Sequence, residues 1–363
     1  MLTSYIGADV DSKMTDLAVE RNQKIVRRFR VPTTIPALEE VLRSIPGRKE
    51  LTFEEGPMAD WLYCGLHRCV DKLVVCDPRR NKLISDDGDA DDVIDAGKLA
   101  CLLRGNFLRP VHHSLDGEQV VFRQWMSLYH DRVRQSVREI NKLRGRCRMY
   151  GVRPPRGAMR NPEVRKVWLV QLEQSPLAEQ LKLLWIGFDA VAQQMEICRK
   201  KASELGKGKQ IIKYWKDVPG IGPIRAATIF AYVETPHRFM NNPHKLWKYC
   251  GVGIQRSSSG KDKDGKPKIG ILQLAWQVNR RLKDAVMGGA ISAINQKHNV
   301  FAEIYGRLVR DGIAPGNARH TVARKMLTVM WGMWKTQSRF DDELVCQENK
   351  SKGKDNGKGG CSR

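Results

Sequence analysis

Four carboxylates near the start of the chain have the types and spacing to hold a divalent metal ion. Asp9 lies in a short apolar run, and Glu54 directly follows another. Asp92 and Asp95 lie in a segment with helical periodicity, and their i, i+3 spacing places both on one helical face. Each carboxylate alone is typical of a solvated surface. Four that converged would repel one another unless a cation neutralised them.

The chemistry that such a site supports is phosphoryl transfer. Ligands that are all oxygen favour Mg²⁺ over zinc, and Mn²⁺ can substitute for it. Two such ions roughly 4 Å apart can activate one oxygen and stabilise another during the transfer. The sequence therefore predicts a site in which Asp9, Glu54, Asp92 and Asp95 are both metal-binding and catalytic.

A second candidate for chemistry is the serine-rich segment RSSSGK at residues 256–261. On composition alone this segment is a loop. A serine attacks phosphate only when a nearby base or metal activates it. The basic side chains of Arg256, Lys261 and Lys263 could then stabilise charge on the transferring phosphoryl group.

Two glycines, Gly220 and Gly222, stand in the segment VPGIGP before an Ala-rich helix. Such a turn resembles a helix-hairpin-helix motif, in which glycines let backbone N–H groups approach a phosphate near a helix N-terminus. These contacts position nucleic acid without reading its sequence. A tight turn between packed helices is the alternative interpretation.

The elements that must position these residues alternate between strands and helices over residues 1–105. Three strands, of which the second and third flank an Asn22-Gln23 turn, predict an antiparallel meander. Helices and strands then alternate, which gives the order β-β-β-α-β-α-β-α. The expected strands are Tyr5–Val10, Thr15–Glu20, Ile25–Val31, Leu51–Phe53 and Leu73–Cys76, and the expected helices are Thr34–Ile45, Pro57–Cys69 and Asp91–Leu103. In an open α/β sheet, ligands gather at the carboxyl ends of such strands.

The rest of the chain is mostly helical. Long basic amphipathic helices are predicted at Phe122–Leu143 and Leu177–Leu205, with a break at Val152–Gly157. They could form an antiparallel pair that joins subunits or grips nucleic acid, or an ordinary internal bundle. After a Gly-Lys linker at Gly206–Lys209, a further helical segment runs to about residue 336, and a Lys/Gly/Ser-rich tail is expected to be disordered.

Charge is distributed unevenly along the 363 residues, whose net charge is +23. Residues 1–105 hold 16 Lys and Arg against 18 Asp and Glu, whereas the remainder holds 47 against 22, a surplus of +25. A polyanionic partner for the remainder is the natural inference, because cations that neutralise phosphates release counterions and raise affinity. Improved solubility is the alternative explanation.

Composition also argues against several protein classes. Nine scattered cysteines without a C-x-x-C pair indicate neither a disulfide framework nor a zinc site. No apolar stretch approaches the length of a membrane span, and the N-terminus lacks the layout of a signal peptide. We expect a cytoplasmic protein that associates with the nucleoid and does not engage a membrane.

Together, the carboxylates and the β/α order resemble the ribonuclease H-like fold. More specifically, the chain resembles the DEDD transposases of the IS-one-ten insertion-sequence family, which are relatives of the Piv-type invertases. The resemblance extends in family order over nearly all of residues 5–335. It rests on the motifs GADVDSK, FEEGP, DDVIDAGKLA, VPGIGPIRAATIFAYVE, KYCGVGIQRSSSGKDKDGKPKIG and ARKMLTVMWGMWK.

This resemblance favours Asp9 and Glu54 over their acidic neighbours as ligands. It also implies that Ser259 is the nucleophile, because it stands eight residues after Gly251, the spacing of the family motif, although Ile254 replaces the usual proline. Strand alternation would put Asp11 on the side of Asp9, where either could touch metal, whereas Glu55 would face away from Glu54. The contribution of Asp11 or Glu55 is left open.

The resemblance further implies a RuvC-like DEDD catalytic domain at 1–110, a helical coiled-coil region at 111–205, a C-terminal transposase domain with the serine at 206–337 and a basic disordered tail at 338–363. Its implied activity is Mg²⁺-dependent cleavage and strand exchange through a covalent phosphoserine. The implied partners are donor and target DNA, a noncoding bridge RNA and further copies of the chain, as a dimer or tetramer. A Piv-type invertase, a metal-dependent junction resolvase or nuclease, and a decayed, non-catalytic nucleic-acid-binding protein are the alternatives.

Overall fold

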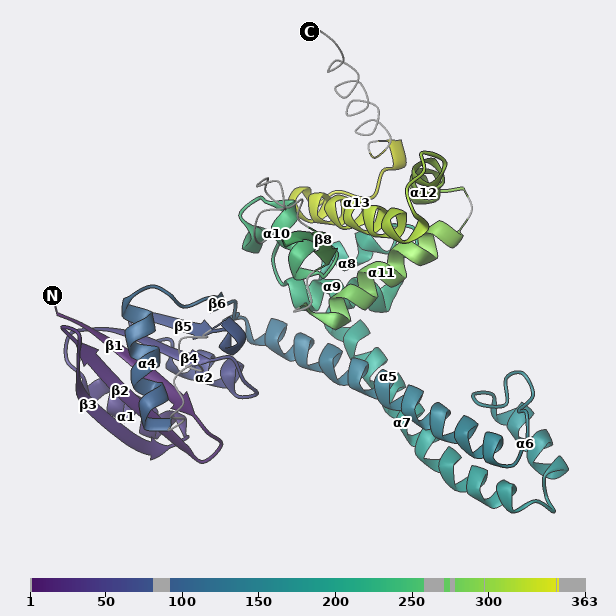
Figure 1. Cartoon of the computed structure of the whole chain (residues 1–363), viewed down its shortest axis with the longest axis horizontal. Coiled ribbons are helices and arrows are strands. Elements are labelled where there is room, and N and C mark those ends of the chain that lie inside the picture. Colours follow the sequence, from purple (N-terminus) through teal and green to yellow (C-terminus); the bar gives the residue numbers. More distant parts are fainter. Residues whose placement is uncertain are drawn as a thin grey trace, which may run out of the picture. The chain divides into compact units, whose positions relative to one another are not determined.

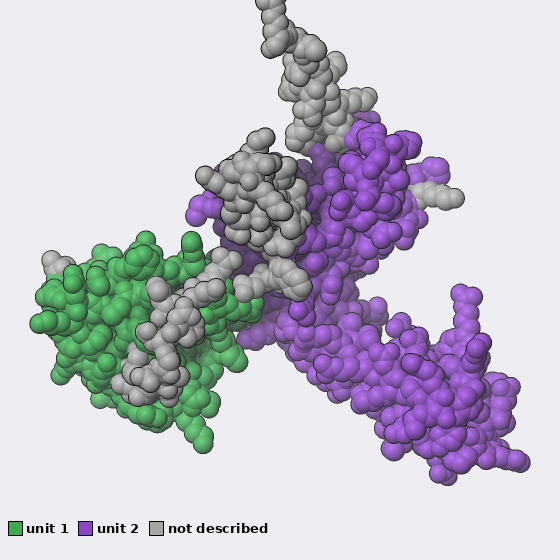
Figure 2. All heavy atoms as spheres, viewed as in Figure 1, with its two compact units in different colours: residues 1–120 green, residues 121–363 purple. Residues whose placement is uncertain are grey.

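The computed structural model describes residues 2–80, 92–257, 271–274, 278–296, 298–343 and 345. The chain divides into two compact units, residues 1–120 and residues 121–363 (Figure 2). The first unit is built on a mixed sheet, and the second is mostly helical (Figure 1). The further division of the helical part at residue 205 stays a prediction.

The first unit contains a six-stranded sheet with the order β3-β2-β1-β4-β5-β6. β1, β2 and β3 pair antiparallel, β4 and β5 continue the sheet parallel to β1, and β6 is antiparallel to β5. Asn22 and Gln23 have φ angles of 51° and 65°, as a two-residue hairpin turn favours. The expectation of a mixed α/β first domain is confirmed. The strands span Thr3–Val10, Met14–Arg21, Lys24–Pro32, Arg48–Glu54, Lys72–Cys76 and Pro110–Val111.

Alternation along the strands gives the sheet two apolar faces. On one face, Ala8 and Phe53 share a core with residues of α1 (Ile35–Ser44) and α2 (Ala59–Leu66). The side chain of Thr34 begins α1 by accepting a hydrogen bond from the Ala37 amide. On the other face, α4 (Asp92–Arg104) packs its leucines against Tyr5, Val74 and Cys76. A 3₁₀ turn, η1, spans Pro78–Arg80.

Gly7 permits α4 to approach β1 closely. A Cβ at this position would lie 2.6 Å from the Ala100 amide nitrogen and 2.9 Å from the Leu99 Cβ, and it would also collide with the Ala96 carbonyl. A Cβ would thus overlap the helix backbone, which has no flexible end that can move aside. The contact between α4 and the first strand therefore requires glycine.

We predict that Gly7→Ala destabilises the sheet by about 3 kcal/mol, because the helix must move away from the strand. Hydrogen exchange of the β1 and β4 amides in increasing urea measures the effect in the full chain. Gly56→Ala is the matched control, because a Cβ there would meet nothing within 4 Å. Equal stability of the two variants would contradict the proposed packing role.

An antiparallel helical hairpin opens the second unit. α5 (Gly117–Met149) and α7 (Pro176–Gly206) lie side by side (Figure 1), and Arg132 donates to Gln194 across them at 3.1 Å. At the tip, α6 (Pro162–Gln171) contributes Trp168 to a small separate core, where its ring lies 6.0 Å from that of Trp185. The hairpin thus has its own packing at the end distant from the C-terminal helices.

The C-terminal helices enclose the largest core of the chain. Trp331 and Trp334 are buried in it, and Trp215 donates a 2.9 Å hydrogen bond to the Met330 carbonyl. These three tryptophans therefore pack together in the core of the helical part. The elements are α8 (Gln210–Trp215), α9 (Pro223–Val233), η2 (Pro236–Phe239), α10 (Pro243–Tyr249), β7 (Ile254–Ser257), β8 (Ile271–Leu274), α11 (Arg280–Asn295), α12 (Val300–Arg310) and α13 (Pro315–Thr336).

Ordered packing continues past the expected domain end at residue 337. Phe340 stacks on Phe301 with ring centroids 6.0 Å apart, and Val345 is buried. The beginning of the stretch 338–363 therefore belongs to the helical core, which corrects its assignment to a disordered tail. Residues 346–363 lie outside the described residues. Within the described part of the chain, none of the helices combines the length and apolar character needed to cross a bilayer.

Candidate active site

Asp9 and Glu54 end neighbouring parallel strands on the same face of the sheet. Asp9 is the last but one residue of β1, and Glu54 is the last residue of β4. The strands are in register at Ala8 and Phe53, which both point toward α1 and α2. Because side chains alternate, the next residue on each strand points to the α4 face. The structure thus brings these two predicted ligands to one place.

The other two predicted ligands belong to α4, which covers that same face. Asp95 precedes Ala96, the residue whose carbonyl lies against Gly7, two residues before Asp9. Its carboxylate is about one-third exposed and lies 3.9 Å from the Lys98 ammonium group. Asp92 begins the helix, but its side chain lies outside the described residues.

A carboxylate that we did not predict, Asp16, stands on β2 directly opposite Asp9. Asp16 is 6% exposed, and its Oδ2 lies 3.9 Å from the Nε of Arg30. It lines a hollow of about 270 Å³ together with Arg28, Arg30 and Ala96 of α4. The short turn between the first two strands fixes the hairpin register, so its length could have predicted that Asp16 lies opposite Asp9.

Asp11 and Glu55, the acidic neighbours of the predicted ligands, have other surroundings than Asp9 and Glu54. β1 ends at Val10, so strand alternation does not extend to Asp11, which lies in the turn and is exposed. Backbone amides of Ser12 and Lys13 hydrogen-bond to this carboxylate and lower its pKa. Glu55 instead binds a histidine. Neither position is supported as a metal ligand.

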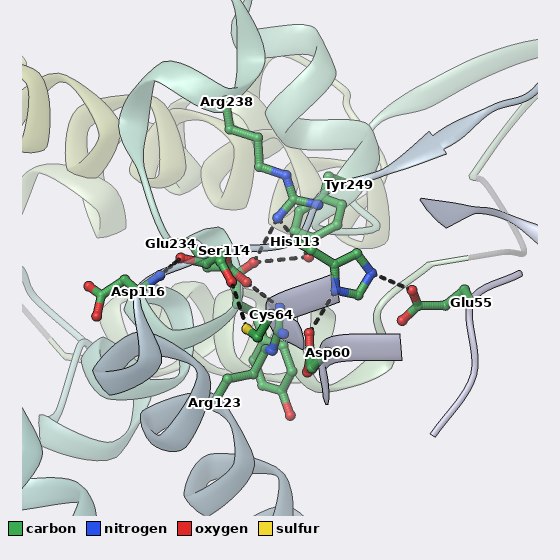
Figure 3. A network of polar contacts seen from close by, with 11 residues as sticks. Glu55, Asp60, Cys64, His113, Ser114, Asp116, Arg123, Glu234, Arg238 and Tyr249 are labelled. Atoms are coloured by element: carbon green, nitrogen blue, oxygen red, sulfur yellow. Dashed lines mark hydrogen bonds and ion pairs between the residues drawn. The ribbon is translucent and has the colours of Figure 1, made fainter. Parts of the chain in front are cut away.

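That histidine is His113, which bridges two carboxylates in the first unit. Its Nε2 lies 2.6 Å from Glu55 Oε2 and its Nδ1 lies 2.7 Å from Asp60 Oδ1 (Figure 3). The side chain is 2% exposed, and the Tyr63 ring packs 5.4 Å away. The bridge ties the segment after β6 to the loop that follows β4, directly beside Glu54. No sequence pattern marked His113, because its partners lie more than fifty positions away.

His113 is positively charged at neutral pH. Burial opposes its charge, but hydrogen bonds from the ring to Asp60 and Glu55 outweigh burial and raise the pKa of His113 to about 9. Since this value exceeds the ordinary 6.5, the bridge stabilises the folded state fully below about pH 6.5. The stabilisation is lost as pH rises through about 9.

We predict that His113→Gln removes a pH-dependent contribution on the order of 2–3 kcal/mol. The difference in unfolding free energy between wild type and variant should be largest near pH 6 and should shrink toward pH 10, as measured by urea unfolding of the full chain. Asp60→Asn, which removes one partner, should weaken the same dependence in part. A difference that does not change with pH would contradict a charged bridge.

The predicted serine block lies mostly outside the described residues. This applies to Ser259, Lys261 and Lys263, and to the side chain of Arg256, whose backbone pairs with Leu272. The described strands β7 and β8 form an antiparallel ribbon, and residues 258–270 connect them. The sequence between the two strands is therefore the segment that holds the proposed nucleophile.

The two glycines of the VPGIGP turn have different surroundings. Gly220 has a φ of +82°, and a Cβ there would lie 2.7 Å from the Ala293 amide of α11. Arg225 also donates to the Gly220 carbonyl at 2.7 Å, so this glycine serves helix packing. Gly222 caps the N-terminus of α9, and a Cβ there would meet nothing within 4 Å. Only Gly222 leaves room for a phosphate to approach.

Among the side chains that the structure describes, no three His, Cys, Asp or Glu residues gather as a metal site would require. That set excludes the side chain of Asp92, one of the four predicted ligands. The adjacent pair of Asp9 and Glu54 offers oxygen donors only, which is the ligand chemistry that Mg²⁺ prefers. These observations leave the metal site as a proposal.

Comparison with known proteins gives one match, which lies within the second unit. Residues 213–306 match the model of a transposase family. The family is Transposase_20, described as the transposase IS116/IS110/IS902 family, and the match supports the assignment of the chain to it. The matched residues include the VPGIGP turn and the serine block, but none of the four predicted metal ligands. No curated protein matches the chain.

Proposed function

We propose that this chain is a transposase that cuts and rejoins DNA with a carboxylate-bound Mg²⁺ and the hydroxyl of Ser259. The observation that carries the proposal is the placement of Asp9 and Glu54 at neighbouring strand ends, on the face that α4 covers. The transposase family match lies in the other unit of the chain and is independent of this geometry.

The proposed fold of the first unit is ribonuclease H-like, of the RuvC type. Three antiparallel strands followed by parallel strands, in the order β3-β2-β1-β4-β5, support this proposal. In an open α/β sheet the carboxyl ends of adjacent strands form the ligand-binding edge. Asp9 of β1 and Glu54 of β4 occupy that edge.

Asp9, Glu54, Asp92 and Asp95 would hold the metal. Bound Mg²⁺ would neutralise these carboxylates and stabilise negative charge on phosphate oxygens. The protein itself supplies the positions: β1 and β4 fix two carboxylates, and α4, which carries Asp95, covers the same face. The ion pair between Arg104 and the buried Glu20, at 2.6 Å, fastens the far end of α4 to the sheet.

Ser259 would attack the DNA phosphorus through its Oγ. The new Oγ–P bond replaces one backbone P–O bond, and the leaving deoxyribose oxygen takes up a proton to become a hydroxyl. Attack by a hydroxyl of another strand reverses the step, so no external energy source is needed. Arg256, Lys261 and Lys263 would stabilise the phosphoryl charge, and Gly222, at the N-terminus of α9, would lie near the DNA backbone.

The partners we propose are donor and target DNA, a noncoding bridge RNA that specifies them, and further copies of the chain. The surplus of +25 beyond residue 105 supports binding of two kinds of nucleic acid. In a dimer or tetramer, Ser259 of one subunit would act with the carboxylates of another.

We predict that Ser259→Ala abolishes the covalent DNA adduct and lowers strand cleavage by about 1,000-fold or more, because no other hydroxyl replaces the nucleophile. Its affinity for DNA should stay within about three-fold of wild type, since the serine is uncharged. Mass spectrometry of the adduct and gel-based cleavage assays measure the two effects. Full cleavage by this variant would assign the attack to water and favour a nuclease.

A matched pair of adjacent substitutions tests the carboxylate assignment. Glu54→Gln should lower Mg²⁺-dependent cleavage by at least about 100-fold, because it removes a charged ligand. Glu55→Gln removes the neighbouring carboxylate, which binds His113, and should retain most activity below the unfolding temperature. Cleavage rates against Mg²⁺ concentration distinguish them, and equal losses would contradict the assignment.

A further inference from the structure

A cluster of cationic side chains lies where the chain enters the β7–β8 ribbon. Gly251 has a φ of +73° and lies against the start of α11, where a Cβ would be 3.2 Å from Lys283 Cδ. One residue later, the Val252 carbonyl accepts a 3.1 Å hydrogen bond from Arg324 of α13. Lys283 and Arg324 thus flank the turn that leads into β7.

His320 belongs to the same cluster. It precedes Arg324 by four residues on α13, so both occupy one face of the helix, and α13 packs on α11. Burial and the charges of Lys283 and Arg324 lower the pKa of His320, which keeps the ring neutral at pH 7. Its Nδ1 is buried and has no hydrogen-bond partner among the described residues.

The two cations of the cluster are not paired with carboxylates in the described part of the chain. There, neither Lys283 nor Arg324 forms an ion pair with a carboxylate. The first turn of α11 contains no acidic residue, although helix N-termini favour anions and disfavour cations. Like charges beside a helix N-terminus are unfavourable unless an anion binds among them.

We propose that Lys283, His320 and Arg324 form a phosphate-binding site for the DNA strand that the ribbon engages. Lys283 and Arg324 supply charge, and His320 supplies a neutral ring that can donate or accept a hydrogen bond. The proposal rests on the proposed function, because it places a DNA phosphate near the segment that holds Ser259. It adds residues from α11 and α13, which are distant in sequence from the serine block.

The test measures binding of the full chain to a fluorescein-labelled DNA duplex by fluorescence anisotropy over a range of salt concentrations. Lys283→Gln should weaken binding about ten-fold and lower the slope of log affinity against log salt by about 0.9, the value for one lost phosphate contact. Lys283→Arg should restore affinity. His320→Leu removes a hydrogen-bonding group without changing the charge at pH 7, and should weaken binding about three-fold or more.

Arg310→Gln is the matched control, because it removes one positive charge from an exposed position on α12. It should alter affinity less than about two-fold. An equal loss in Arg310→Gln and Lys283→Gln, or wild-type binding by both Lys283→Gln and His320→Leu, would overturn the proposal. The same variants are also measured with a labelled single-stranded RNA of the same sequence. If they lose affinity for this RNA but not for the DNA duplex, the ligand is not DNA and the proposal is overturned.

These outcomes are separate from failure of the proposed function. Binding is measured without cleavage, so it does not depend on the identity of the nucleophile. If Ser259→Ala still forms the adduct, the proposed mechanism fails whatever the anisotropy result. Thermal unfolding of each variant, followed by circular dichroism, shows whether a loss of binding reflects unfolding.

Discussion

The close packing of α4 on β1 at Gly7 is the contact on which the candidate active site depends. A side chain there would overlap the helix backbone, so the helix would move away from the strand. Because Asp9 follows Gly7 by two residues and Asp95 precedes Ala96, the contact sets how far apart these carboxylates are. The Arg104–Glu20 ion pair holds the C-terminal end of the helix, so α4 is fixed to the sheet at two places along its length.

Glycines play a similar role in the second unit. Gly220 brings the α8–α9 turn against α11, and Gly251 brings the entrance of the ribbon against the start of the same helix. α11 therefore contacts both segments that we connect with phosphate. Lys283 of the proposed phosphate site belongs to α11, which these contacts fix, and Arg324 of α13 donates to the Val252 carbonyl beside Gly251. Packing and proposed binding thus depend on the same close approaches.

Charged residues are distributed differently in the two units of the chain. The first unit is nearly neutral and concentrates carboxylates at one sheet edge, where Asp16 adds another to those at Asp9 and Glu54. The surplus of positive charge lies beyond residue 105. Such a separation suits a protein in which one region would bind cations and another would bind polyanions. Within the first unit, the charge of His113 stabilises Glu55 and Asp60, two carboxylates that the proposed metal site does not use.

Local patterns in the sequence predicted five strands and the helices of the first unit, and the shared face of Asp9 and Glu54, because periods of two and 3.6 residues follow from backbone geometry alone. They therefore predicted that Asp9 and Glu54 would share an edge and that α4 would carry Asp95. Only the tertiary structure decided the partners of Asp16, His113 and Lys283. Those contacts join residues from strands and helices far apart in the chain, and no local period encodes such a distance. The same reason applies to Gly220. The local VPGIGP motif suggested that it contacts a phosphate, whereas the structure shows that it packs against α11.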